Sequence, residues 1–306
     1  HQRRCRTPRR RLDGTGSGPV ALNARRNPID ADDCFVGVDL GTSGCRAMAI
    51  GRGGEVRAES RTGLPASRHP DAGCSEQVPQ HWWDAVRQVL DDIVGSRPGR
   101  IRAIAVDGTS STLLLCRADG SACSPALMYD DVRAVEQARR IAAVAPADSP
   151  ARGPASTLAK LLYLLDRPGS DLAAHAVHQA DWIAGRLIGR FGMSDENNAL
   201  KLGYDPSNRH WPSWVSSLLP RPQLLPRVVP VATPLGPVSR AAAAELDLPD
   251  DTLVVAGTTD SNAAALAAGI HEVGDAVTSL GSTLVLKVLA DRPVTASRFG
   301  VYSHRI

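Results

Sequence analysis

Two short turns of glycine and hydroxyl residues carry the residue types that could bind a phosphate. The first turn occupies residues 41–44 and the second residues 281–283, and each lies between two apolar runs of strand length. Such a turn directs backbone N–H groups and small hydroxyls to one point, which makes a concave site for an anion. Asp39 directly precedes the first turn, and its carboxylate could hold a hydrated Mg²⁺ beside phosphate oxygens. The alternative for either turn alone is an ordinary hairpin connection.

A further carboxylate, Asp260, follows an apolar strand pattern at residues 254–257 and precedes a helix that we expect to begin at Ser261. Open α/β sheets bind ligands just beyond the carboxyl ends of their strands, so Asp260 lies where a ligand could bind. The other interpretation is a helix N-cap, a position that Asp strongly favours. The two roles are compatible.

The elements that must position these residues alternate between strand and helix, which predicts an α/β fold. Strands are expected at residues 34–39, 45–50, 101–106 and 112–116, and helices at 81–94, 158–165, 180–191 and 241–246. The proline-rich stretch 220–237 is predicted to be an extended surface connection, because proline is excluded from helix interiors and central strands. Residues 40–43 align with 280–283, and this internal similarity suggests a duplicated domain.

The charge, apolar runs and cysteines of the chain bear on nucleic-acid binding, membrane insertion and redox compartment. The formal net charge is +3, but eight arginines lie in the first 26 residues, so the remainder is slightly acidic and a nucleic-acid surface is not expected. No uninterrupted apolar run approaches the roughly 20 residues of a membrane span, and we expect none. The six cysteines are scattered without a Cys-x-x-Cys pair, which favours a reducing compartment.

The first residues form an Arg-rich segment without an apolar core, more typical of an organelle transit peptide than of a secretory signal. A disordered extension is the alternative. The expected location is therefore the cytoplasm or the chloroplast. The missing initiator Met indicates a fragment.

Three motifs resemble those of the FGGY carbohydrate kinase family, which belongs to the actin-like ATPase superfamily. Asp39-Leu-Gly-Thr-Ser-Gly-Cys-Arg46 resembles the first phosphate motif, Gly257-Thr-Thr-Asp-Ser-Asn-Ala263 the catalytic segment, and Ser279-Leu-Gly-Ser-Thr283 the second phosphate motif. They occur in the family order, and the resemblance covers residues 34–306. It implies a ribonuclease H-like domain with a mixed sheet and helices on both faces, followed by the start of a second similar domain.

The resemblance also implies roles for individual residues. Asp260 would be the general base that takes the proton from the attacking sugar hydroxyl, with Ser261 beside it as a substrate contact. ATP and Mg²⁺ would be required, with Asp39 holding the metal through water. The residues implied in phosphate and ATP binding are Asp39, Gly41, Thr42, Ser43, Arg46, Gly281, Ser282 and Thr283.

The expected sugar segment, Asp107-Gly-Thr-Ser-Ser111, departs from the Gln-x-His-Gly pattern of xylulokinases and glycerol kinases. Together with motifs at 126–133 and 197–206 it resembles the ribulokinase-like and xylulose kinase-like group of plants and cyanobacteria. Ser110 or Ser111 would then donate to a sugar oxygen, and the Asp131 and Arg133 pair would lie near the substrate. The alternatives are turn chemistry for the serines and a solvated surface pair for Asp131 and Arg133.

We therefore expect residues 1–32 to be the Arg-rich extension, 33–275 the N-terminal kinase domain, and 276–306 the first hairpin of a truncated C-terminal domain. The expected activity is ATP-dependent phosphorylation of a ketopentose, D-ribulose or xylulose. Because the part of the family that holds adenine is missing, we expect the chain alone to be inactive. The alternatives are a kinase of another polyol, such as glycerol or gluconate, and a catalytically dead domain that binds sugar or a protein.

Overall fold

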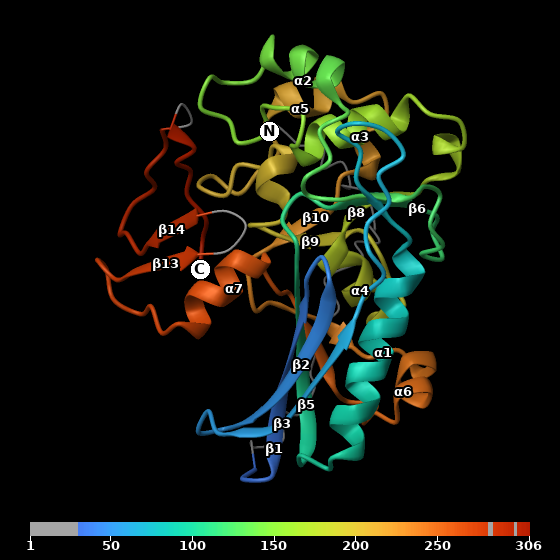
Figure 1. Cartoon of the computed structure of the whole chain (residues 1–306), viewed down its shortest axis with the longest axis vertical. Coiled ribbons are helices and arrows are strands. Elements are labelled where there is room, and N and C mark those ends of the chain that lie inside the picture. The colour runs from blue at the N-terminus through green and yellow to red at the C-terminus, as the bar shows by residue number, and fades with distance from the viewer. Residues whose placement is uncertain (1–29, 281–283, 297–298) are drawn as a thin grey trace, which may run out of the picture. The chain divides into compact units, whose positions relative to one another are not determined.

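A mixed six-stranded sheet is the centre of the fold in the computed structural model, which describes residues 30–280, 284–296 and 299–306. Its strand order is β11-β12-β5-β1-β2-β3 (Figure 1). β1 pairs in parallel with β5 and antiparallel with β2. The strands are β1 (Asp33–Leu40), β2 (Gly44–Gly51), β3 (Val56–Gly63), β5 (Arg100–Gly108), β11 (Pro234–Pro237) and β12 (Leu253–Val255).

The sheet forms because its central strands alternate buried and less buried positions. In β1 the buried residues Cys34, Val36 and Val38 face the core, while Asp39 points to the other face. The parallel register sets Asp39 of β1 beside Asp107 of β5. The carboxyl ends of these two strands therefore carry two carboxylates on the same face.

Three helices cover the core face of the sheet and contact one another: α1 (Pro79–Gly95), α4 (Gln179–Ile188) and α6 (Arg240–Leu246). In α1, the buried residues Trp82, Val86, Val89 and Ile93 recur at helical spacing. α7 (Asp260–Ala267) contacts β5 and lies on the opposite side of the sheet from α1 (Figure 1). The predicted α/β class with a mixed sheet is confirmed.

A second layer surrounds a small sheet of order β4-β7-β6-β8 and a second apolar cluster. This layer is drawn above the main sheet in Figure 1. The strands of the small sheet are β4 (Glu76–Gln77), β6 (Leu113–Cys116), β7 (Ala126–Leu127) and β8 (His175–His178). A separate pair consists of β9 (Met193–Asp195) and β10 (Arg227–Val229). The helices of this layer are α2 (Val135–Ala142), α3 (Thr157–Leu165) and α5 (Ser213–Leu218).

The second predicted strand–turn–strand unit is present as β13 (Ala276–Leu280) paired antiparallel with β14 (Leu284–Val288). Its turn, with Gly281, Ser282 and Thr283, lies outside the described residues, as does most of the Arg-rich segment 1–32. Among the described residues, no helix is long and apolar enough to cross a bilayer.

The proline-rich stretch 220–237 was predicted to be only a connection, and this is wrong in part. It contains β10 and β11, and β11 pairs with β12 at the edge of the main sheet. An edge position tolerates proline because one side of the strand needs no ladder hydrogen bonds.

Candidate active site

Three carboxylates from separate elements gather where β1 and β5 end and α7 begins. Asp39 and Asp107 are paired across the two strands, and Asp260 is the first residue of α7. A bridge between Gly108 and Thr259 joins the end of β5 to the residue before Asp260. Thr259 is the N-cap of α7, so Asp260 does not occupy the cap position. This position leaves the Asp260 carboxylate available for chemistry.

Gly257 allows the chain to pass close to β5 on its way to Asp260. A Cβ atom at this position would lie 1.9 Å from the carbonyl oxygen of Val106, so any larger residue would push the two segments apart. Two hydrogen bonds to the Thr258 hydroxyl then fix the next residue, from Asn197 Nδ2 at 3.0 Å and from Asn262 Nδ2 at 3.2 Å. The two residues 257 and 258, which lead to Asp260, are thus fixed by close packing on β5 and by these hydrogen bonds.

The pKa values of two of these carboxyls are raised. Burial, followed by the negative charges of Asp39 and Asp260, raises the pKa of Asp107 to about 8. Burial also raises the pKa of Asp260, although the N–H of Ser261, 2.6 Å from its Oδ1, acts in the opposite direction. A carboxylate with a raised pKa is a stronger base, which suits Asp260 to proton abstraction.

We expect the Asp107→Asn protein to be more stable than the wild type at pH 8, by at least about 1 kcal/mol, since one unit of pKa shift is worth about 1.4 kcal/mol. A carboxyl with a folded pKa of about 8 keeps a proton that the unfolded chain, with a pKa near 4, has released. Folding therefore takes up a proton between roughly pH 4 and 8, and wild-type stability falls as pH rises through this window. Asparagine carries no such penalty and can donate to Asp39.

Urea unfolding of both proteins from pH 4 to pH 8 measures this difference. The stability gap should widen as the pH rises. An Asp107→Asn protein less stable than the wild type at every pH would contradict the raised pKa of Asp107.

The first phosphate turn is a tight, partly exposed connection between β1 and β2. The backbone N–H of Gly41 donates to the Gly44 carbonyl at 3.0 Å, and Thr42 and Ser43 lie at least partly in solvent. Arg46 lies 3.9 Å from Asp39, with 76% of the Arg side chain exposed. These predicted phosphate residues are therefore brought together with Asp39. Their roles stay predictions, as do those of residues 281–283.

The Gln77 side chain is hydrogen-bonded to this turn. Its Nε2 donates to the Thr42 carbonyl at 2.8 Å, and its Oε1 accepts from Trp82 Nε1 at 2.7 Å. Gln77 is 5% exposed and its bond with Trp82 is buried, so the indole N–H cannot easily find water in its place. Glutamine at this position thus anchors the phosphate turn to α1.

Gln77→Leu should lower the free energy of unfolding by about 1–3 kcal/mol, because it leaves the buried indole N–H of Trp82 and the partly buried Thr42 carbonyl without their side-chain partner. It should also raise KM for ATP more than KM for sugar. Gln88→Leu is the matched control: Gln88 accepts from the Thr62 hydroxyl at an exposed site, so its loss should cost at most about 0.5 kcal/mol. Equal effects of the two substitutions would contradict the support role.

The predicted sugar serines lie in the turn after β5, and they differ in access. Ser110 is partly exposed, whereas Ser111 is 2% exposed and has the left-handed backbone angle φ 69°. Gln179 fixes the start of the turn by accepting from the N–H of Thr109 at 2.9 Å and from its hydroxyl at 2.8 Å. Of the two serines, Ser110 has the more accessible side chain.

Asp131 and Arg133 form a buried pair, not a solvated one. Asp131 is fully buried and accepts from the Ser75 N–H at 2.7 Å and from Arg133 Nη2 at 2.7 Å. Arg133 also donates to Glu76 at 2.7 Å. The surface-pair alternative is therefore wrong. The oxygens of Asp131 are engaged within the protein, so the pair fixes the loop after β7, and its predicted substrate contact has no support in these hydrogen bonds.

Three charged residues near the site were given no role of their own in the sequence analysis: Asp107, Lys201 and Lys287. The positive charges of Lys201 and Lys287 act to lower the pKa of Asp260. Lys287, on β14, donates to Asn262 on α7, which joins the second hairpin to the helix that begins at Asp260. Asp107 could have been found from its sequence, because it ends an apolar strand in the same way as Asp39.

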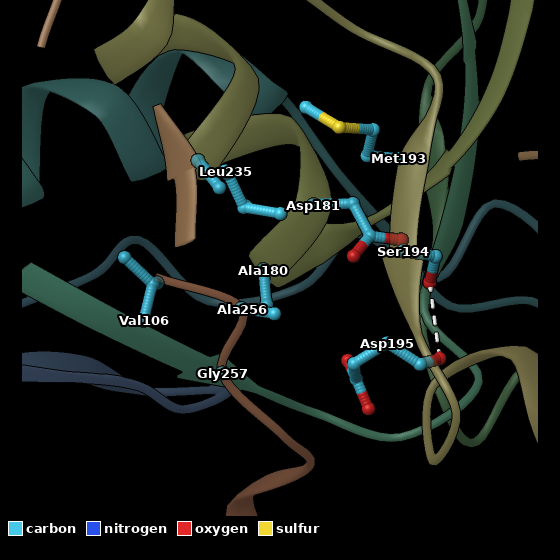
Figure 2. A pocket seen from close by; sticks show the side chains of 10 residues that line it. Val106, Ala180, Asp181, Met193, Ser194, Asp195, Leu235, Ala256 and Gly257 are labelled. Carbon is cyan, nitrogen blue, oxygen red and sulfur yellow. Dashed lines mark hydrogen bonds between the residues drawn. The ribbon is translucent and has the colours of Figure 1, made fainter. Parts of the chain in front are cut away.

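A small pocket lies beside this site, between α4, β9 and the segment that leads to Gly257 (Figure 2). Figure 2 shows the Asp181 and Asp195 side chains among mostly apolar neighbours. Burial, followed by the charge of Asp181, raises the pKa of Asp195 to about 6. None of the predicted site residues that the structure describes lines this pocket.

The carboxylates fit the predicted magnesium ion. The Asp39 side chain is 46% exposed, and Oδ1 of Asp107 is a buried oxygen without a hydrogen-bond partner. Mg²⁺ in proteins commonly takes one or two carboxylates and completes its shell with phosphate oxygens and water. Within the described ranges, no group of three or more His, Cys, Asp or Glu residues is arranged to hold a metal alone. A metal here would therefore need the phosphates.

Comparison with solved structures gives the same fold. Xylulose kinase from Rhodospirillum rubrum matches with a TM-score of 0.76 at 25% identity, covering 85% of this chain and 57% of that one. Gluconate kinase from Lactobacillus acidophilus matches with a TM-score of 0.77 at 18% identity, covering 86% of this chain and 55% of that one. At this identity the second likeness shows the fold alone.

Comparison of sequences gives the family. A xylulose kinase from Streptomyces coelicolor is 32% identical over 276 residues, which cover 86% of this chain and 54% of that protein. The chain spans about half the length of the curated relatives it matches. Residues 34–267 match the N-terminal domain model of the FGGY family of carbohydrate kinases. The chain therefore belongs to the FGGY family of carbohydrate kinases.

Proposed function

We propose that this chain carries the catalytic base and the first phosphate turn of an ATP- and Mg²⁺-dependent ketopentose kinase. The observation that carries the proposal is the convergence of Asp39, Asp107 and Asp260 at the carboxyl ends of β1 and β5, next to the turn at residues 41–44. Family membership supports the reaction class, and the relatives named xylulose kinase support a ketopentose.

In this proposal, Asp260 takes the proton from the sugar hydroxyl as that oxygen attacks the transferred phosphoryl group. Its raised pKa favours this acceptance. Asp39 would hold the metal, and the turn after β1 would provide N–H groups for phosphate oxygens. When bound, Mg²⁺·ATP supplies the phosphoryl group and neutralises its charge. Because the transition state is loose, the contribution of Asp260 is mainly to orient the hydroxyl.

The turn after β5 is the proposed sugar contact, through Ser110. Its Asp-Gly-Thr-Ser sequence is the feature that favours D-ribulose, while the named relatives favour xylulose. Fixed hydroxyl and carboxylate partners select one polyol over another, because a wrong sugar leaves them buried without a partner. The choice between these sugars is left to the assay.

A coupled ADP-release assay tests the proposal on the longest polypeptide that the gene encodes, and on this chain alone. The panel is D-ribulose, D-xylulose, L-ribulose, glycerol and gluconate, each with Mg²⁺ and ATP. Turnover with a ketopentose supports the proposal. Turnover only with glycerol or gluconate would replace it with a polyol kinase, and sugar binding without turnover would replace it with a non-catalytic binding domain.

A further inference from the structure

Lys160 is a buried cation whose function nothing above explains. It stands in α3 among leucines, with 0% of the residue exposed. A lysine in such a position loses the hydration of its ammonium group, and burial lowers the pKa of Lys160 to about 7. Buried lysines are rare unless their ammonium groups are fully paired. The hydrogen-bond partners of Lys160 therefore indicate what the residue does.

These partners are three backbone carbonyls from two separate segments. Lys160 Nζ donates to the Ser111 carbonyl at 2.9 Å, in the turn after β5. It also donates to the carbonyls of Met128 at 2.6 Å and Tyr129 at 3.2 Å, in the loop after β7. The three N–H groups of an ammonium match three acceptors. Lys160 thus ties the proposed sugar turn to the loop that holds Asp131.

The turn after β5 needs this support because its backbone is in an unfavourable region. Ser111 has φ 69°, where a residue other than glycine costs energy and persists only if its surroundings hold it. Gln179 holds the beginning of the turn through Thr109, and Lys160 holds its end through Ser111. Ser110, the partly exposed residue, lies between these two anchors.

We propose that Lys160 is a positioning residue of the sugar site, which fixes the turn at residues 109–112 through the Ser111 carbonyl and so sets the place of Ser110. Its ammonium group donates to three backbone carbonyls, so its expected effect on the sugar is through the turn. This inference rests on the proposed function, because it assumes that the turn contacts the sugar. The phosphate turn has its own anchor, Gln77. The loss of the Lys160 ammonium should therefore weaken sugar binding and leave ATP binding nearly unchanged.

The test compares Lys160→Met with Leu161→Ala in the longest polypeptide that the gene encodes. Methionine keeps the length of the side chain and removes the ammonium. Leu161 is the adjacent buried residue of the same helix, and its truncation weakens the core while the Lys160 hydrogen bond to the turn is kept. We expect Lys160→Met to raise KM for the ketopentose about 10- to 100-fold, with KM for ATP changed less than about threefold.

Leu161→Ala should lower the unfolding temperature comparably and leave both KM values near wild type. Equal sugar KM values for the two variants would overturn the proposal. If Lys160→Met does not fold, Lys160→Gln, which keeps two N–H donors, is measured in its place with the same expected direction.

A second readout does not depend on activity. Amide hydrogen exchange should become at least about tenfold faster at residues 109–112 and 128–131 in Lys160→Met, but not in Leu161→Ala. If no sugar is turned over by the wild type, the proposed function fails while this readout still tests the anchor. Unchanged exchange at both segments would overturn the positioning role, whatever the substrate.

Discussion

Asp260→Asn is expected to lower ketopentose-dependent turnover by about two to four powers of ten, the usual contribution of a positioned general base. Asparagine keeps the shape of the side chain and can still accept from the Ser261 N–H, so the start of α7 should be preserved. The dissociation constant for the sugar should change little, because the substitution removes a proton acceptor. Steady-state turnover and calorimetric sugar binding measure the two effects separately.

The pH profile gives the same residue a second readout. Since burial raises the pKa of Asp260, the carboxylate needed as base is lost as pH falls through that raised pKa, and wild-type turnover should fall on the acid side. The residual activity of Asp260→Asn should lack this acid limb. Asp251→Asn, in an exposed ion pair with Arg100, is the matched control and should keep wild-type turnover. Near-normal turnover of Asp260→Asn would remove Asp260 from the reaction.

Asp39→Asn is expected to lower kcat/KM for Mg²⁺·ATP by about 100- to 1,000-fold, in the range found when a charge-stabilising group is removed from an active site. The carboxylate is half-exposed at the carboxyl end of β1 and precedes the phosphate turn, so its loss should not disturb the core. Its loss should also weaken divalent cation binding, which Mn²⁺ titration in the presence of ATP measures without turnover.

The control for this variant is Asp91→Asn, an exposed carboxylate on α1. It should leave cation affinity and kcat/KM unchanged. If Asp39→Asn bound Mn²⁺·ATP as tightly as the wild type, the metal role of Asp39 would be wrong, and the turn would bind phosphate without that carboxylate.

The local features of the fold were predictable from the sequence because local patterns determine them. Apolar runs of strand length on both sides of a Gly-Thr-Ser turn predicted the β1–β2 hairpin, and a helical pattern of tryptophan, valine and isoleucine predicted α1. Asp260 was correctly expected to follow β12, because the residues that connect a strand to the next helix lie at the carboxyl end of that strand.

The missed features depend on contacts between segments distant in sequence. Asp107 ends an apolar strand as Asp39 does, but its place beside Asp39 depends on the parallel pairing of β5 with β1, which the local pattern of either strand does not show. Lys160 lies within an apolar helix, where spacing alone does not show that its ammonium binds three carbonyls. Asp131 and Arg133 have the composition of a surface pair, and only the packing of Glu76 and Ser75 against them shows that they are buried.

The measurement that tests the central claim most directly is ³¹P NMR of the reaction of ATP and Mg²⁺ with D-ribulose or D-xylulose, using the longest polypeptide that the gene encodes. The account predicts a new phosphomonoester resonance that grows as ATP is consumed, and its virtual absence with Asp260→Asn. Inorganic phosphate as the only product, or the same ester formed at the same rate by Asp260→Asn, would contradict it.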